Sequence, residues 1–175
     1  MKRLEQLICA IALTILLVYP RGTPHKNPEI AKNNPRTVQQ EQQCIAEALW
    51  HEARGEPKDG IIAVLEVIQN RTHAKGYAST FCGVVQQPKQ FSYRNHLKQG
   101  QIVKTDLNKL QQAEREIHTY IQELAFRAAV GSFKGILGDS TVLYYHTVQL
   151  KKIPKWSKQN KKYAIIGSHI FISRV

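Results

Sequence analysis

The sequence predicts an α+β domain, with helices in its first part and a short β-hairpin at its C-terminal end. Two patterns carry this prediction. In three segments between residues 38 and 133, apolar residues recur at the helical period of about 3.6 residues. After Gly138 the chain becomes rich in β-branched and aromatic residues, in "STVLYYHTV" and "AIIGSHIFISRV", as strands usually are. The length of 175 residues favours one domain with a core of its own.

Three helices are predicted from the apolar spacing and from the residues that end helices. The first covers residues 38–53, and Gly55 is suited to the position just past its end. The second covers residues 57–73, starts at a proline and is apolar nearly all round, which is typical of a buried helix. Glycine and proline break up residues 74–94, so this segment is predicted to be a loop with at most a short extended piece. The third helix is predicted over residues 106–133.

The N-terminus has the pattern of an export signal. Two basic residues precede residues 7–19, thirteen residues without a charge. This run is shorter than the roughly 20 residues that cross a bilayer comfortably, and no small-x-small cleavage site follows it. Residues 1–19 therefore predict either a cleaved signal peptide or a retained anchor in the inner membrane, formed by residues 4–19. Either one places the protein in the periplasm or cell envelope.

A linker is predicted to follow this signal. Residues 20–40 hold four prolines and little that could be buried, which is typical of a tether. The folded domain is then predicted to cover residues 41–175.

The charge restricts the class of partner. The chain has 25 Lys+Arg against 13 Asp+Glu, a net charge of +12, and therefore attracts polyanions. Trp156 and Tyr163 lie among the lysines of "LKKIPKWSKQNKKY", as in some nucleic-acid sites. Because an exported protein rarely meets nucleic acid, we expect no nucleic-acid partner and interpret this run as a clamp for an acidic glycan.

The cysteines are consistent with export. Cys44 and Cys82 lie in the predicted domain, where an oxidising compartment would allow one disulfide between them. Two buried, reduced thiols are the alternative reading. Neither cysteine belongs to a C-x-x-C pair, so their spacing matches no zinc pattern.

Two glutamates in "HEARGEP" are the candidates for chemistry. Glu52 follows Ala48 by four residues and Ile45 by seven, so it continues the apolar face of its helix. Burial disfavours the charged form of a carboxyl and raises its pKa, as a general acid near neutral pH requires. The alternative for Glu52 is an ion pair with an arginine, either Arg71 or Arg54. Glu56 comes just before a helix start, where the helix dipole favours an acidic residue, so it is expected to support the site.

A zinc site would need a different set of residues. The protease motif H-E-x-x-H fails here because Gly55 occupies the second histidine position. Three histidines from different elements could still meet at a metal: His51, His146 and His169.

Longer stretches of the chain resemble a known family. "AEALWHEARGEPKDGIIAVLEVIQNR", "FCGVVQQPKQFS" and "YYH…IPKWSK…IGSHIF" are similar, in the same order, to the SleB-type cell-wall hydrolases, typified by the spore cortex-lytic enzyme. The resemblance spans residues 44–171. It implies a small, lysozyme-like, mostly helical domain that cleaves peptidoglycan glycan strands as a lytic transglycosylase and uses no cofactor.

The resemblance also implies roles for single residues. Glu52 matches the family's essential acid, at the bond between N-acetylmuramic acid and N-acetylglucosamine. Asn70 and Arg71 match further family positions. The residues expected to bind or line the substrate groove are Glu56, Gln90, Phe91, Ser92, Tyr144, His146 and His169. Only Glu52 has a physical reason to be protonated, which favours a mechanism with one carboxylate over the pair that ordinary glycosidases use.

The chain departs from the family pattern at four places. Ile61 stands where the family usually has glutamine, and Glu66 where it has an apolar residue. The lead-in to the Tyr-His segment is reduced to "GDSTV", and residues 98–115 form an extra charged stretch. Two other functions stay open at this point: a zinc-dependent peptidoglycan amidase and a non-catalytic, basic wall-binding module.

Overall fold

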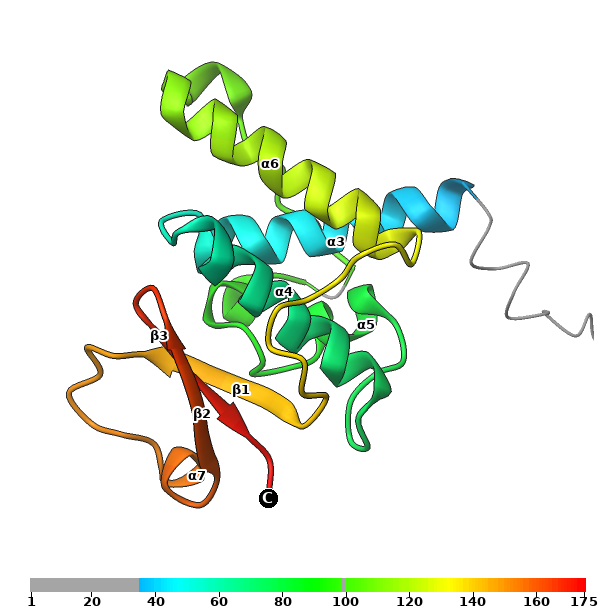
Figure 1. The fold of residues 1–175 in the computed structure, drawn as a ribbon. Coiled ribbons are helices and arrows are strands. Elements are labelled where there is room, and N and C mark those ends of the chain that lie inside the picture. Colours follow the sequence, from blue (N-terminus) through cyan, green and yellow to red (C-terminus); the bar gives the residue numbers. More distant parts are fainter. Residues whose placement is uncertain (1–34, 99) are drawn as a thin grey trace, which may run out of the picture. The chain divides into compact units, whose positions relative to one another are not determined.

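The computed structural model describes residues 35–98 and 100–175 (Figure 1). Its helices are α3 (Pro35–Ala53), α4 (Lys58–His73), α5 (Phe81–Gln86), α6 (Gln112–Ala129) and α7 (Lys155–Lys158), with 3₁₀ turns η1 (Ser92–His96) and η2 (Leu107–Lys109). The strands are β1 (Val142–Thr147), β2 (Lys161–Ile166) and β3 (His169–Ser173). The predicted α+β class is therefore confirmed, with most of the regular structure helical.

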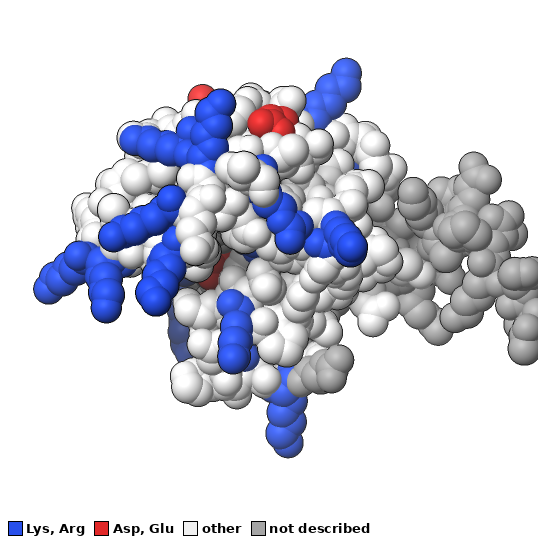
Figure 2. Space-filling view, turned by 90° about the horizontal axis from the view of Figure 1, so that it is seen from below, with Lys and Arg blue, Asp and Glu red and all other residues white. Residues whose placement is uncertain are grey.

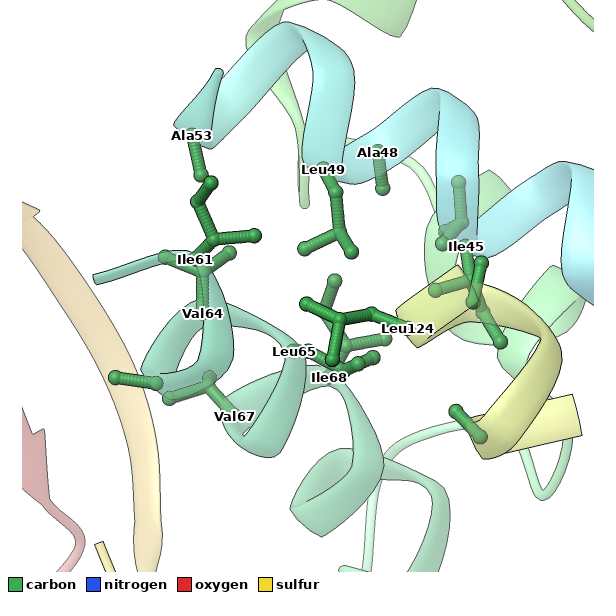
Figure 3. Close-up of a cluster of buried hydrophobic side chains, with 14 of the residues drawn as sticks. Ile45, Ala48, Leu49, Ala53, Ile61, Val64, Leu65, Val67, Ile68 and Leu124 are labelled. Carbon is green, nitrogen blue, oxygen red and sulfur yellow. The ribbon is translucent and has the colours of Figure 1, made fainter. Parts of the chain in front are cut away.

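The helices pack around α4. Helix α3 lies against both α6 and α4, and β1 lies on another side of α4 (Figure 1). Apolar side chains from α3, α4 and α6 point toward one another and fill the space between the three helices (Figure 3). On α4 the apolar residues Ile61, Val64, Leu65, Val67 and Ile68 have no exposed surface. Helix α4 is apolar nearly all round because other elements cover it on several sides.

The C-terminal segment forms a sheet of three antiparallel strands in the order β1-β3-β2. The predicted hairpin was too small, because "AIIGSHIFISRV" supplies both β2 and β3. These strands turn at Gly167, whose φ of +58° suits glycine, while "VLYYHT" adds β1 as a third strand. The prediction missed the tight turn at Gly167, because it treated "AIIGSHIFISRV" as one apolar run.

The helix boundaries differ from the prediction at three places. Helix α3 begins at Pro35, inside the predicted linker, because the glutamines and glutamate after it are good helix formers. Helix α6 begins at Gln112 and not at Asp106, whose side chain accepts from the N–H of Asn108 and holds a 3₁₀ turn. It ends at Ala129, four residues early, where Gly131 turns the chain with a φ of +77°.

Helix α5 lies in the segment predicted to be a loop. Its N-cap is Thr80, whose hydroxyl accepts from the N–H of Gly83 at 3.0 Å. The structure joins Cys82 of α5 to Cys44 of α3 in a disulfide. The N–H of Cys82 also donates to the Glu41 carboxylate at 3.2 Å, so α5 is fixed to α3 by two kinds of bond.

Two buried carboxylates hold the segments that depart from the family pattern. Glu66 on α4 accepts from the backbone N–H groups of Ile136 and Leu137, both at 2.6 Å, and of Gly138 at 2.9 Å. Glu47 on α3 accepts from Arg94 and, at 2.9 Å, from the N–H of Val103 in the extra stretch. Each carboxylate satisfies buried polar groups of a loop that would otherwise lack partners.

Within residues 35–98 and 100–175, no helix combines the length and the apolar character that a membrane span requires. The predicted signal or anchor, residues 1–19, and residues 20–34 of the predicted linker lie outside the described residues.

We expect removal of the disulfide to destabilise the domain without unfolding it. Cys44→Ala combined with Cys82→Ala frees a loop closed over a sequence separation of 38, so the free energy of unfolding should fall by about 4 kcal/mol. Urea unfolding of the oxidised protein and of the double variant measures the difference. Reduction of the unmutated protein should give a similar loss, and equal stability of all three forms would contradict the prediction.

Candidate active site

Glu52 lies in the last turn of α3, facing the sheet. Its side chain is half-buried, and its Oε2 accepts a hydrogen bond from the hydroxyl of Tyr145 on β1 at 3.2 Å. Burial raises the pKa of Glu52, while the Tyr145 hydrogen bond and the charge of Arg71 lower it to a smaller extent. A carboxyl in this setting can hold a proton at a pH at which an exposed glutamate is ionised.

Tyr145 is the residue of the candidate site that the sequence analysis missed. It lies on the same face of the sheet as His169 and Phe171 of β3, with ring centroids 5.1 and 6.0 Å away. Burial and the neighbouring Glu52 charge raise the pKa of Tyr145 well above its usual value, so its hydroxyl keeps its proton and donates. Alternation along β1 could have suggested either Tyr144 or Tyr145 for this face. An irregularity between Val142 and Tyr144 shifts the register of β1, and the sequence does not show it.

The two arginines considered as partners of Glu52 are engaged elsewhere. Buried Arg71 donates from Nε to the carbonyl of Leu143 at 2.8 Å and lies over the rings of Tyr77 and Phe91. Arg54 donates to the carbonyl of Trp50 at 2.9 Å. The alternative of a direct ion pair is therefore not observed for Glu52, and only the nearby charge of Arg71 acts on its pKa.

Glu56 connects two turns. Its carboxylate accepts from the N–H of Ser168 at 2.8 Å and from the Ser168 hydroxyl, and lies 3.7 Å from Nδ1 of His169. A Cβ at Gly167 would come within 2.2 Å of this carboxylate, so the turn has no room for a side chain there. Because its oxygens already have partners, Glu56 holds the β2–β3 turn against the start of α4.

The other residues predicted to line a groove come from the segment around η1 and from β1. Gln90 is half-buried, Phe91 is buried beneath Arg71, and Ser92 is exposed at the start of η1. Tyr144 and His146 pack against Trp156 of α7, with ring centroids 5.4 and 5.9 Å away. Their contact with substrate stays a prediction.

The three histidines of the zinc alternative are not brought together. His51 is exposed on α3 and stacks on Tyr93, with ring centroids 4.3 Å apart. Both ring nitrogens of His146 have protein partners, the Thr147 carbonyl at 2.8 Å and the Ser157 hydroxyl at 3.0 Å. His169 is buried beside Glu56, and burial lowers its pKa. In the described part of the chain, no three His, Cys, Asp or Glu side chains are grouped as a metal site requires.

A family model described as Cell Wall Hydrolase matches residues 55–172. The chain belongs to the cell wall hydrolase family. The resemblance drawn from the sequence motifs is thereby confirmed. The matched range begins three residues after Glu52, so the role of this glutamate depends on the geometry of the site.

Curated relatives and solved structures agree with this assignment. The chain is 29% identical over 129 residues to the spore cortex-lytic enzyme of Bacillus cereus and 27% identical over 127 residues to that of Bacillus subtilis. The matches cover 74% and 73% of this chain, but only 42% and 35% of those proteins.

Two solved structures match nearly over their whole length. The catalytic domain of SleB from Bacillus cereus has a TM-score of 0.53 and 28% identity, and the match covers 77% of this chain and 91% of that domain. The catalytic domain of the germination-specific lytic transglycosylase SleB from Bacillus anthracis has a TM-score of 0.55 and 26% identity, covering 89% and 100%. The cell wall hydrolase domain is thus the part that this chain shares with its longer relatives.

Tyr145→Phe should raise the pKa of Glu52 further. The Tyr145 hydroxyl stabilises the ionised carboxylate, so its loss leaves burial less opposed. A ¹³C NMR titration of the Glu52 carboxyl in both proteins measures the change. Tyr163→Phe serves as the control. It also removes a tyrosine hydroxyl of the sheet, but one that donates to the carbonyl of Leu137. An unchanged or lower pKa in Tyr145→Phe would show that this hydroxyl does not stabilise the carboxylate.

Glu52→Gln should be more stable than the unmutated protein at neutral pH. The folded-state pKa of Glu52 lies above the unfolded value of about 4.3, so the unmutated protein loses stability as the pH rises from that value through the folded pKa. Glutamine does not titrate, and the stability difference in favour of the variant should grow across this window. Urea unfolding at pH 4 and pH 7 tests this, with the exposed Glu123→Gln as background. A difference that is constant with pH would contradict it.

Proposed function

We propose that this protein cleaves the glycan strands of peptidoglycan as a lytic transglycosylase, with Glu52 as its general acid and then its base. The observation that carries the proposal is the half-buried Glu52 carboxyl, held by Tyr145 and with its pKa raised by burial. Family membership and likeness to two SleB catalytic domains support peptidoglycan as the substrate. The cell envelope, where the predicted export would deliver the protein, is the proposed place of action.

The reaction needs only one carboxyl group. Protonated Glu52 would give its proton to the glycosidic oxygen as the bond to C1 of N-acetylmuramic acid breaks. The 6-hydroxyl of the same sugar then attacks C1, and the Glu52 carboxylate takes the proton of that hydroxyl. The products are a free 4-hydroxyl on N-acetylglucosamine and a 1,6-anhydro end, and Glu52 is protonated again.

Glu56 is poorly suited to be a second reacting carboxylate. Hydrolytic glycosidases place two carboxyl groups on either side of the bond that breaks. Here the Glu56 carboxylate accepts hydrogen bonds from Ser168 and lies beside His169. It is therefore not free to act as the base that an attacking water would need. This arrangement favours the internal 6-hydroxyl as the nucleophile.

Tyr145 and Arg71 have a proposed part in the same cycle. When Glu52 loses its proton, the hydroxyl of Tyr145 can donate to the new carboxylate, and the nearby charge of Arg71 also favours the ionised form. Burial thus favours the protonated carboxyl, and these two side chains favour the ionised carboxylate. A group that first donates and then accepts a proton needs both states to be accessible.

Muropeptide mass spectrometry tests the proposal. Digests of purified peptidoglycan should contain 1,6-anhydro-muramic ends, and Glu52→Gln should lower their rate of formation roughly 10²- to 10⁴-fold. Glu56→Gln, compared at a temperature where it stays folded, should still form the same products because Glu56 is assigned to the turn and not to the reaction.

Other products would assign another function. Ordinary reducing ends would indicate hydrolysis. Release of stem peptides, lost on addition of a chelator, would indicate the amidase. Binding to peptidoglycan without any product would indicate a wall-binding module, and full activity of Glu52→Gln would remove Glu52 from the mechanism.

A further inference from the structure

We propose that the outer surface of residues 148–165 is a docking surface for an anionic phospholipid membrane. This surface, called here the basic apolar patch, comprises the loop after β1, α7 and strand β2. The proposal is independent of the proposed function, because it concerns where the domain lies and not which bond it cleaves.

The charge of this part of the chain has one sign. From residue 140 to residue 175 there are seven Lys and Arg residues and no Asp or Glu. Six of the seven are exposed lysines of the patch: Lys151, Lys152, Lys155, Lys158, Lys161 and Lys162. Figure 2, seen from below, shows basic side chains projecting from this face of the molecule and acidic side chains at only a few places. Each such lysine adds attraction to an anionic membrane surface.

Large apolar side chains lie among these lysines. Six of the eleven exposed large hydrophobic residues of the described chain belong to the patch: Val148, Leu150, Ile153, Trp156, Tyr163 and Ile165. Their exposed fractions lie between 37% and 53%. All six come from a stretch of 18 residues, and exposed apolar residues gathered in one region are typical of an interaction surface.

The combination of lysines and exposed apolar side chains favours a membrane over the other anionic partners. A glycan strand or a nucleic acid would attract the lysines, but it offers no place for the aliphatic side chains of Leu150, Ile153 and Ile165. An anionic bilayer offers both a negative headgroup layer and an acyl boundary below it. Lysines carry their charge at the end of a flexible apolar stem, so they can reach headgroups while the apolar residues enter deeper.

The patch is fixed to the sheet that carries Tyr145 of the candidate active site. The Ser157 hydroxyl of α7 bonds to Nε2 of His146 at 3.0 Å, and Trp156 packs on Tyr144. Both partners belong to β1, the strand that also carries Tyr145 beside Glu52. In Figure 1 the loop between β1 and α7 projects away from the helices, so the patch can meet a flat surface without displacing them. Docking of the patch would therefore fix the orientation of β1, and with it Tyr145, relative to the membrane.

Vesicle co-sedimentation of the full chain tests the docking. We expect the protein to bind phosphatidylglycerol-containing vesicles more tightly than phosphatidylcholine vesicles, and added salt to weaken this binding. The triple change Lys151→Gln, Lys152→Gln and Lys155→Gln should weaken it at least roughly tenfold. The matched control removes the same charge elsewhere, at exposed Lys98, Lys104 and Lys109, and should bind as before. The apolar residues 7–19 are present in every protein compared and contribute equally.

A fluorescence measurement reports on the patch itself. The chain has two tryptophans, so Trp50→Phe leaves Trp156 as the only one. Brominated lipids in anionic vesicles should quench Trp156 fluorescence, and Leu150→Ser with Ile153→Ser in the same background should reduce the quenching. Unchanged thermal unfolding of the variants shows that the fold is kept.

Three results would overturn the proposal. Equal losses in the two triple variants would mean that net charge alone causes binding. Sedimentation with anionic vesicles without quenching of Trp156 would place the contact elsewhere on the chain. Loss of binding to purified peptidoglycan, with vesicle binding unchanged, would assign the patch to the acidic glycan.

Discussion

Polar side chains of α4 hold the sheet by its backbone. Glu66 accepts from three consecutive N–H groups before β1, and Asn70 donates to the carbonyls of Asp139 and Val142 at 3.0 and 3.1 Å. Arg71 donates to the carbonyl of Leu143. Glu56, just before the helix, fixes the β2–β3 turn. Since α3 packs on another side of α4, this one buried helix sets the distance between Glu52 and Tyr145, which come from different layers.

At Glu52 the requirements of the proposed chemistry and of stability conflict. Burial of Glu52 helps a general acid but makes its ionised form unfavourable, so the same feature that favours the chemistry lowers stability at neutral pH. The compensation comes from the surroundings. The disulfide fixes α3 to α5, and the core around Leu49, Leu65 and Leu124 joins α3 to α4 and α6. A rigid frame of this kind can hold a carboxyl in a position that is unfavourable for that carboxyl alone.

The predictable features are those whose cause is local. The apolar stripe of α3 indicated that Glu52 would be buried, and the structure shows it half-buried. The apolar composition of α4 indicated the burial of that helix. Helix α5 was missed because six residues are too few to show a helical period, and its cap at Thr80 is a weak signal. The pairing of Cys44 with Cys82 stayed open because sequence spacing does not show that their Cα atoms lie 5.1 Å apart. Tyr145 could not be chosen over Tyr144 because the shifted register of β1 depends on its pairing with β3.

The bonds from Glu66, Asn70 and Arg71 go to peptide groups and not to side chains. A peptide group is the same whichever residue carries it, provided that the residue is not proline where an N–H is needed and fits the space available. At exposed positions such as Ile136 and Ser140 the side chain can therefore change while β1 keeps its place, whereas the buried side chains of Leu137, Val142 and Leu143 are also needed for packing. The place of β1 is thus set by hydrogen bonds from α4 to the backbone of the loop before it, in addition to packing.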